Sequence, residues 1–92
     1  MAVLLVTYDF NTERSDADRE KLRSALKKAS ISWARLSESS YAVETNDSPQ
    51  VFYGRIASSA DKNDKILVIT LRLPFWGQHS KDVIDWLNAR LT

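Results

Sequence analysis

Two segments of the chain are apolar at nearly every position, and they predict strands that are buried on both faces of a sheet. Residues 2–8 and 65–73 are rich in leucine, valine and isoleucine, without a sustained alternation of polar and apolar positions. Continuous apolar runs of this kind are typical of strands covered on both sides. We therefore expect the sheet face that two helices leave open to be covered by a further helix or by a second subunit.

Apolar residues at helical spacing predict three helices. Residues 16–29 follow Ser15, a favourable N-cap, and they begin with acidic and end with basic residues, as the helix dipole favours. Ser48 and Pro49 form a helix-start signal, so a second helix is expected to run to about residue 60. Ser80 caps a third helix. The apolar positions expected to be buried are Leu22, Ala25, Leu26 and Ala29 in the first helix, Val51, Phe52 and Ile56 in the second, and Val83, Ile84, Leu87 and Leu91 in the third.

A hairpin completes the pattern. Ser32–Ser37 and Ser40–Thr45 have the composition of strands, and the pair Glu38-Ser39 separates them. The order β-α-β-β-α-β-α predicts an α+β fold. We expect one domain over residues 1–92, a ferredoxin-like βαββαβ sandwich with an antiparallel sheet in the order 4-1-3-2, followed by a C-terminal helix.

The composition limits the possible partners and compartment of the protein, but it does not indicate a particular function. The 13 basic and 12 acidic residues give a formal net charge of +1, so only a local patch can indicate a nucleic-acid partner. There is no cysteine, which excludes disulfides and thiolate metal sites. No segment reads as a secretory signal or a membrane span, and we expect a cytoplasmic protein with no membrane partner.

Asp9 is the first candidate for a catalytic or metal-binding residue, because it ends a strand that is expected to be buried. The predicted topology brings it to the same end of the sheet as the loop that holds Asp61 and Asp64. Carboxylate oxygens gathered at one place can hold a hard divalent cation such as Mg²⁺ or Mn²⁺. The competing interpretation is structural, since an aspartate after a strand commonly starts a turn by accepting hydrogen bonds from backbone amides.

A basic stripe on the first helix is the second candidate. Arg19, Arg23 and Lys27 recur at every fourth residue and share one face of the helix, and Arg14 precedes them. Such a row can follow the phosphates of a nucleic acid. The competing interpretation is a solvated helix face with local ion pairs, because acidic residues stand between the basic ones.

The aromatic residues and the single histidine, His79, are weaker candidates. Aromatic rings can stack on bases, but in a small domain they more often fill a core or an interface. A lone histidine at a helix start is more often a bystander than a catalyst. No phosphate-binding loop, zinc-protease motif or dinucleotide motif is present, so no motif names a reaction. The aromatic residues in question are Trp33, Tyr53, Phe75, Trp76 and Trp86.

Three short motifs carry a resemblance to a known family. They are VLLVTYDF at residues 3–10, RLSESSYAV at 35–43 and NDKILVI at 63–69. Together they resemble small proteins related to the CRISPR adaptation subunit Cas-two, and most closely short bacterial and phage proteins labelled SinR-like. The resemblance covers most of the chain and implies a ferredoxin-like dimer.

The resemblance also suggests a role for Asp9. In the Cas-two group an aspartate after the first strand lies near its symmetry mate and is linked to metal-dependent nuclease activity, and Asp9 is the matching residue. Other members are scaffolds that hold DNA, and virulence-associated protein D, which shares the fold, is an RNase toxin. This chain differs from the Cas-two pattern, because Arg14 stands where an arginine pair is usual.

The sequence thus predicts a Cas-two-like interaction or scaffold protein that forms a homodimer through its sheet, with DNA or RNA as a candidate partner. One alternative is a Mg²⁺- or Mn²⁺-dependent ribonuclease or deoxyribonuclease, in which Asp9 is catalytic and binds the metal together with Asp64. Another is a phage or mobile-element protein that binds a host protein.

Overall fold

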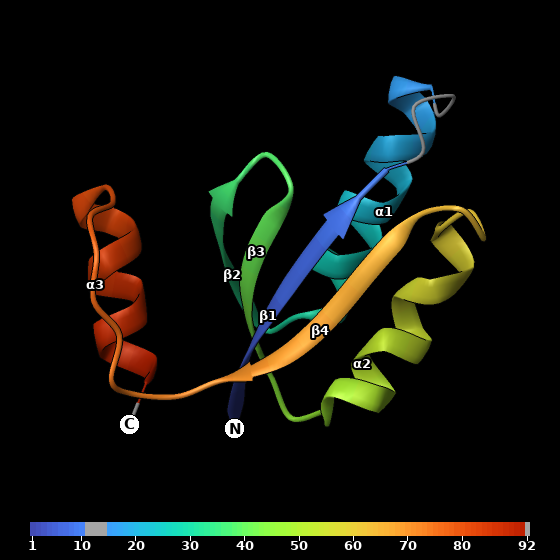
Figure 1. Ribbon diagram of the computed structural model, residues 1–92. Coiled ribbons are helices and arrows are strands. Elements are labelled where there is room, and N and C mark those ends of the chain that lie inside the picture. Colours follow the sequence, from blue (N-terminus) through green and yellow to red (C-terminus); the bar gives the residue numbers. More distant parts are fainter. Residues whose placement is uncertain (11–14, 92) are drawn as a thin grey trace.

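The structure is a computed structural model that describes residues 1–10 and 15–91 (Figure 1). Arg14, one of the predicted basic residues, lies outside these residues. The strands are β1 (Ala2–Asp9), β2 (Ser32–Ser37), β3 (Ser40–Thr45) and β4 (Lys65–Leu71). The helices are α1 (Asp16–Ala29), α2 (Pro49–Ile56) and α3 (Lys81–Arg90), and a 3₁₀ turn, η1 (Ala57–Ser59), follows α2.

The four strands form one antiparallel sheet in the order β2-β3-β1-β4. This is the predicted order 4-1-3-2 read from the opposite edge, so the α+β class and the sheet order are confirmed. Helices α1 and α2 lie on one side of the sheet, whereas α3 lies on the other (Figure 1). The arrangement is compatible with a ferredoxin-like fold.

The predicted helix starts are confirmed by their caps. The hydroxyls of Ser15, Ser48 and Ser80 accept hydrogen bonds from the backbone amides three residues further on. Two predicted ends are wrong. The second helix leaves α-geometry at Ile56, its last fully buried residue, and passes into η1 rather than continuing to residue 60. Strand β4 ends at Leu71, because Leu71 pairs with Val3 and beyond Val3 little of β1 remains to pair with.

The first core fills the space between the sheet and the helices α1 and α2. Phe52 and Ile56 are fully buried there, as predicted, but Val51 is 48% exposed. The expected burial of Val51 is wrong because residues four apart share a helix face, and the pair Phe52 and Ile56 already defines the buried face of this short helix. The residues of this core are Leu4, Val6, Tyr8, Leu22, Leu26, Tyr41, Val43, Phe52 and Ile56.

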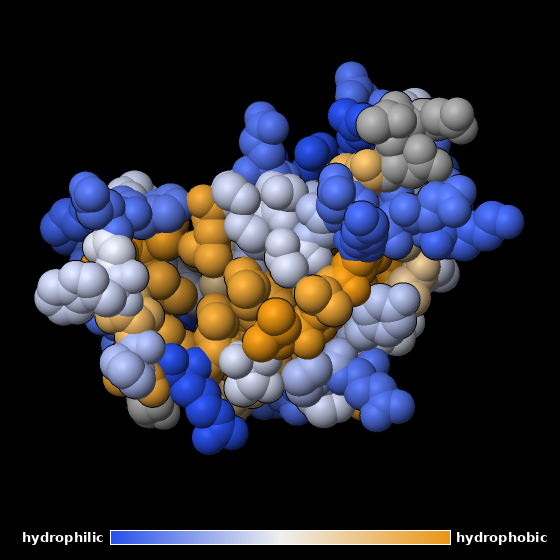
Figure 2. Space-filling view, viewed as in Figure 1, coloured by the Kyte–Doolittle hydropathy of each residue, from blue (hydrophilic) through white to orange (hydrophobic). Residues whose placement is uncertain are grey.

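The second face of the sheet is only half covered. Helix α3 packs its buried residues Val83 and Leu87 against Ala34 and Ala42 of the β2–β3 hairpin. No helix of the described residues lies over the half formed by β1 and β4, and Figure 2 shows this half as a band of apolar surface. This face was expected to be covered by a further helix or by a second subunit. Helix α3 covers only the part formed by β2 and β3.

Candidate functional site

Asp9 lies where the topology predicts. In the sheet register it stands opposite Lys65, the first residue of β4. One residue earlier, the backbone amide of Tyr8 donates a hydrogen bond of 3.0 Å to the carbonyl oxygen of Ser39 in the hairpin turn. The end of β1, the hairpin turn and the start of β4 therefore meet at one end of the sheet.

The acidic residues near Asp9 build a turn. The Oδ2 atom of Asp64 accepts a hydrogen bond of 2.9 Å from the backbone amide of Asp61, and the amide of Asp64 donates to the carbonyl of Asp61 at 3.0 Å. Within residues 1–10 and 15–91, no group of three His, Cys, Asp or Glu side chains is placed to hold a metal ion. Mg²⁺ is commonly held by one or two carboxylates, with water or phosphate oxygens completing its six ligands, so an ion at Asp9 and Asp64 would need those further oxygens.

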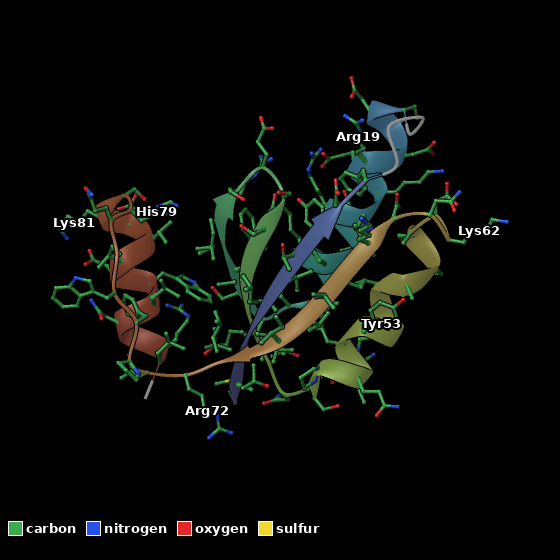
Figure 3. The ribbon with its side chains drawn as sticks, in the orientation of Figure 1. Arg19, Tyr53, Lys62, Arg72, His79 and Lys81 are labelled. Atoms are coloured by element: carbon green, nitrogen blue, oxygen red, sulfur yellow. The ribbon has the colours of Figure 1, made fainter. Side chains whose placement is uncertain are left out.

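The basic stripe of α1 packs onto aromatic rings. The guanidinium carbons of Arg19 and Arg23 lie 6.0 and 5.8 Å from the ring centre of Phe10. One turn further along, the Nζ atom of Lys27 lies 4.6 Å from the ring centre of Trp33. The three residues predicted to share a helix face do so, and Figure 3 shows Arg19 on α1 beside the end of β1.

These rings form a continuous row across three strands and the residue that follows β1. The ring centres of Trp33 and Tyr41 are 5.7 Å apart, those of Tyr41 and Tyr8 are 6.5 Å apart, and those of Tyr8 and Phe10 are 4.8 Å apart. A further cation comes from β2, where the guanidinium carbon of Arg35 lies 5.7 Å from the ring centre of Tyr41. We call this the basic–aromatic surface, made of Arg19, Arg23, Lys27 and Arg35 with Phe10, Tyr8, Tyr41 and Trp33.

The positive charge of this surface is only partly compensated. Arg19 and Arg23 have helical ion pairs with Asp16 and Glu20, at 4.0 and 3.5 Å. Exposed pairs of this kind contribute little and are screened by salt. No carboxylate among the described residues forms an ion pair with Lys27 or Arg35.

Arg35 has a structural contact as well as a charge. Its Nε and Nη2 atoms donate to the carbonyl oxygens of Ser37 and Glu38, at 3.1 and 3.3 Å, and so hold the hairpin turn. These acceptors are neutral, so the guanidinium keeps its full charge. The turn thus fixes one cation at the edge of the row.

Several donors of the basic–aromatic surface lack an acceptor. The Nε atoms of Arg19 and Arg23 and the hydroxyl of Tyr41 are buried without a hydrogen-bond partner. Tyr8 does find one, because its hydroxyl donates to the carbonyl of Glu38 at 2.9 Å. Burial raises the pKa of Tyr8, although a hydrogen bond from Arg23 acts in the opposite direction, so this hydroxyl stays protonated and remains a donor. Buried donors without acceptors are rare in folded proteins, and these three atoms lie beneath the molecular surface, where a ligand does not reach them.

Two other predicted candidates have structural contacts. Trp86 donates from Nε1 to the Ser32 hydroxyl at 2.9 Å, which fastens α3 to β2. The Nδ1 atom of His79 accepts from the amide of Ser80 at 2.8 Å, so its Nε2 atom carries the proton and donates to the carbonyl of Leu36 at 2.7 Å. The histidine therefore anchors the loop before α3 to β2.

The sequence interpretation does not identify four members of the basic–aromatic surface, which are Arg35, Phe10, Tyr8 and Tyr41. Arg35 was not singled out, although it is two residues from Trp33 and therefore shares its face of the strand. Tyr8 and Tyr41 look like ordinary core residues, and only the strand register brings their rings together. The period-two pattern of β2 was the one local signal that pointed to Arg35.

Comparison with models of known protein families gives no match, and comparison with curated proteins gives none either. Within the part of the chain that the structure describes, no helix is long and apolar enough to cross a membrane.

Proposed function

We propose that the protein is a small dimeric scaffold that holds nucleic acid on its basic–aromatic surface. The observation that carries the proposal is the stacking of four cations, Arg19, Arg23, Lys27 and Arg35, on one row of aromatic rings. Residues four apart on a helix are separated by about 6 Å along its axis, which is comparable to the spacing of phosphates along a nucleic-acid strand. The stripe thus offers one cation for each successive phosphate.

The electrostatics of the surface support an anionic ligand. Lys27 and Arg35 are not neutralised by any described carboxylate. Phosphate oxygens are acceptors with a full charge, and their hydrogen bonds to guanidinium groups are among the stronger ones in proteins. Contacts of this type position a strand without reading its sequence, as a scaffold requires.

The scaffold role agrees with the resemblance to Cas-two-like and SinR-like proteins. The strand order supports a ferredoxin-like sandwich as the specific fold. The absence of cysteine is compatible with a reducing compartment, and we keep the cytoplasm as the expected location.

Reversing two charges is expected to remove most of the binding. In fluorescence anisotropy with a labelled oligonucleotide at low salt, Lys27→Glu with Arg35→Glu should weaken binding by about tenfold or more, because two phosphate contacts become repulsive. For the wild type, four phosphate contacts on a single strand predict a slope of about −3 when log affinity is plotted against log salt.

The matched control carries the same change in net charge elsewhere. Lys81→Glu with Arg72→Glu alters two exposed residues that Figure 3 places away from α1, and it should leave binding nearly unchanged. Because Arg35 also holds the hairpin turn, Lys27→Glu alone serves as the variant that leaves those hydrogen bonds intact. Equal losses in the control, or no binding by the wild type, would contradict the proposal.

The dimer of this proposal forms through the uncovered half of the sheet. Leu67 and Ile69 of β4 are 62% and 46% exposed, and Leu5 of β1 stands opposite Ile69. A flat apolar strip of this kind on a single chain marks an interaction site. A two-fold axis lets the same strip cover itself, which makes a second copy the simplest occupant.

The alternative function, a metal-dependent nuclease, depends on the same face. Asp9 lies on the face of β1 that also carries Leu5, so a dimer through this face is the arrangement in which a second chain can supply further carboxylates. We expect no cleavage of RNA or DNA by the wild type with Mg²⁺ or Mn²⁺ at neutral and alkaline pH. Cleavage by the wild type that Asp9→Asn abolishes, without a change in melting temperature, would instead establish the nuclease.

A further inference from the structure

We infer that the basic–aromatic surface takes single-stranded nucleic acid in preference to a duplex, and that Trp33 is the residue that stacks on a base. The inference rests on the proposed function and specifies that the bound nucleic acid is single-stranded. It follows from how the Trp33 ring is held and from how the cations are arranged.

The Trp33 ring is held by its neighbours and remains partly open to solvent. It sits on the edge strand β2, where Tyr41 meets it edge-on at 5.7 Å with an angle of 63° between the ring planes. The Lys27 ammonium lies 4.6 Å from its centre, and 41% of the residue remains exposed. A ring held by neighbours and open to solvent loses little conformational entropy when a base stacks on it.

A duplex cannot use this ring well. In a double helix the face of each base is already stacked on its neighbours, whereas in a single strand the faces are free to meet an aromatic side chain. Such stacking contributes about 1–3 kcal/mol per base. Trp33 is thus a contact that a single strand can make and a duplex interior cannot.

The cations also suit one backbone rather than two. Arg19, Arg23 and Lys27 form a single line on α1, and Arg35 extends that line across Tyr41 to the hairpin. A single line of charges follows one strand of phosphates. An acidic peptide would match the charge but has no base to stack on Trp33, so the exposed ring favours the nucleic acid.

The test compares a short labelled oligothymidylate with the same strand paired in a blunt duplex, by fluorescence anisotropy. The wild type should bind the single strand at least about tenfold more tightly. Trp33→Ala should lower the affinity for the single strand by about tenfold and leave the affinity for the duplex unchanged. Trp33→Phe should retain most of the affinity for the single strand. Trp76→Ala is the matched control, because Trp76 is 101% exposed and lies outside the basic–aromatic surface.

The outcomes separate this inference from the proposed function. Equal affinity for both forms, with no effect of Trp33→Ala but a loss on charge reversal at Lys27 and Arg35, would overturn the inference and leave the proposed function standing. Absence of binding to either form would overturn both. Displacement of the oligonucleotide by an equally charged polyglutamate at the same concentration would show that charge alone is recognised, and it would overturn the role of Trp33. Melting curves of each variant check that a lost signal is not lost fold.

Discussion

Replacing Phe52 with alanine is expected to lower the free energy of unfolding by about 3–5 kcal/mol. The side chain is fully buried on α2, in the core that joins both helices to the sheet. Its removal takes away apolar burial and leaves a cavity that the β-sheet below cannot collapse to fill. Urea titration followed by circular dichroism measures the change.

The neighbouring residue provides the control for Phe52. Val51 lies on the same turn of α2 but is 48% exposed, so Val51→Ala should change the free energy of unfolding by no more than about 0.5 kcal/mol. A loss below about 1 kcal/mol for Phe52→Ala would mean that α2 does not pack as described.

Replacing Ile69 with aspartate is expected to convert a dimer into a monomer. Ile69 is at the middle of β4 on the uncovered face, and a charge there would have to be buried without a partner in the interface. Light scattering at micromolar concentration should give about 21 kDa for the wild type, twice the chain mass of 10.5 kDa, and the monomer mass for the variant.

Thr70→Asp is the matched control for the dimer. Thr70 is the next residue on β4, so its side chain points to the opposite face of the sheet, and it is exposed in the single chain. The same substitution there should leave the dimer intact. A wild type that is monomeric at micromolar concentration would refute the proposed interface.

The elements that the sequence predicts well are those with local signals. Ser15, Ser48 and Ser80 mark helix starts because capping depends on a hydroxyl and an amide three residues apart. The ends of α2 and β4 are harder to predict, since they depend on contacts with distant partners such as Val3. Likewise, no local pattern states which half of a sheet a third helix will cover.

In the candidate site, too, the features that depend on local sequence are predicted and those that depend on distant contacts are not. The spacing of Arg19, Arg23 and Lys27 predicts a shared helix face, because helical periodicity is a local property. The aromatic row beneath them depends on the register of β1, β2 and β3, which sets Tyr8 and Tyr41 side by side and brings Trp33 under Lys27. The sequence therefore predicts three of the four cations and the ring of Trp33, whereas Arg35 and the other rings join the surface only in the folded chain.

The most direct test of nucleic-acid binding on the basic–aromatic surface uses the three tryptophans as reporters. In ¹⁵N-labelled protein each indole N–H gives its own NMR signal. Unlabelled oligothymidylate is titrated into this protein sample. We expect the signals of the Trp33 indole and of the amides around Lys27 and Arg35 to shift progressively, while the signal of the Trp76 indole stays in place. Shifts confined to Trp76 and β4, or no shift at any tryptophan, would contradict the proposed binding.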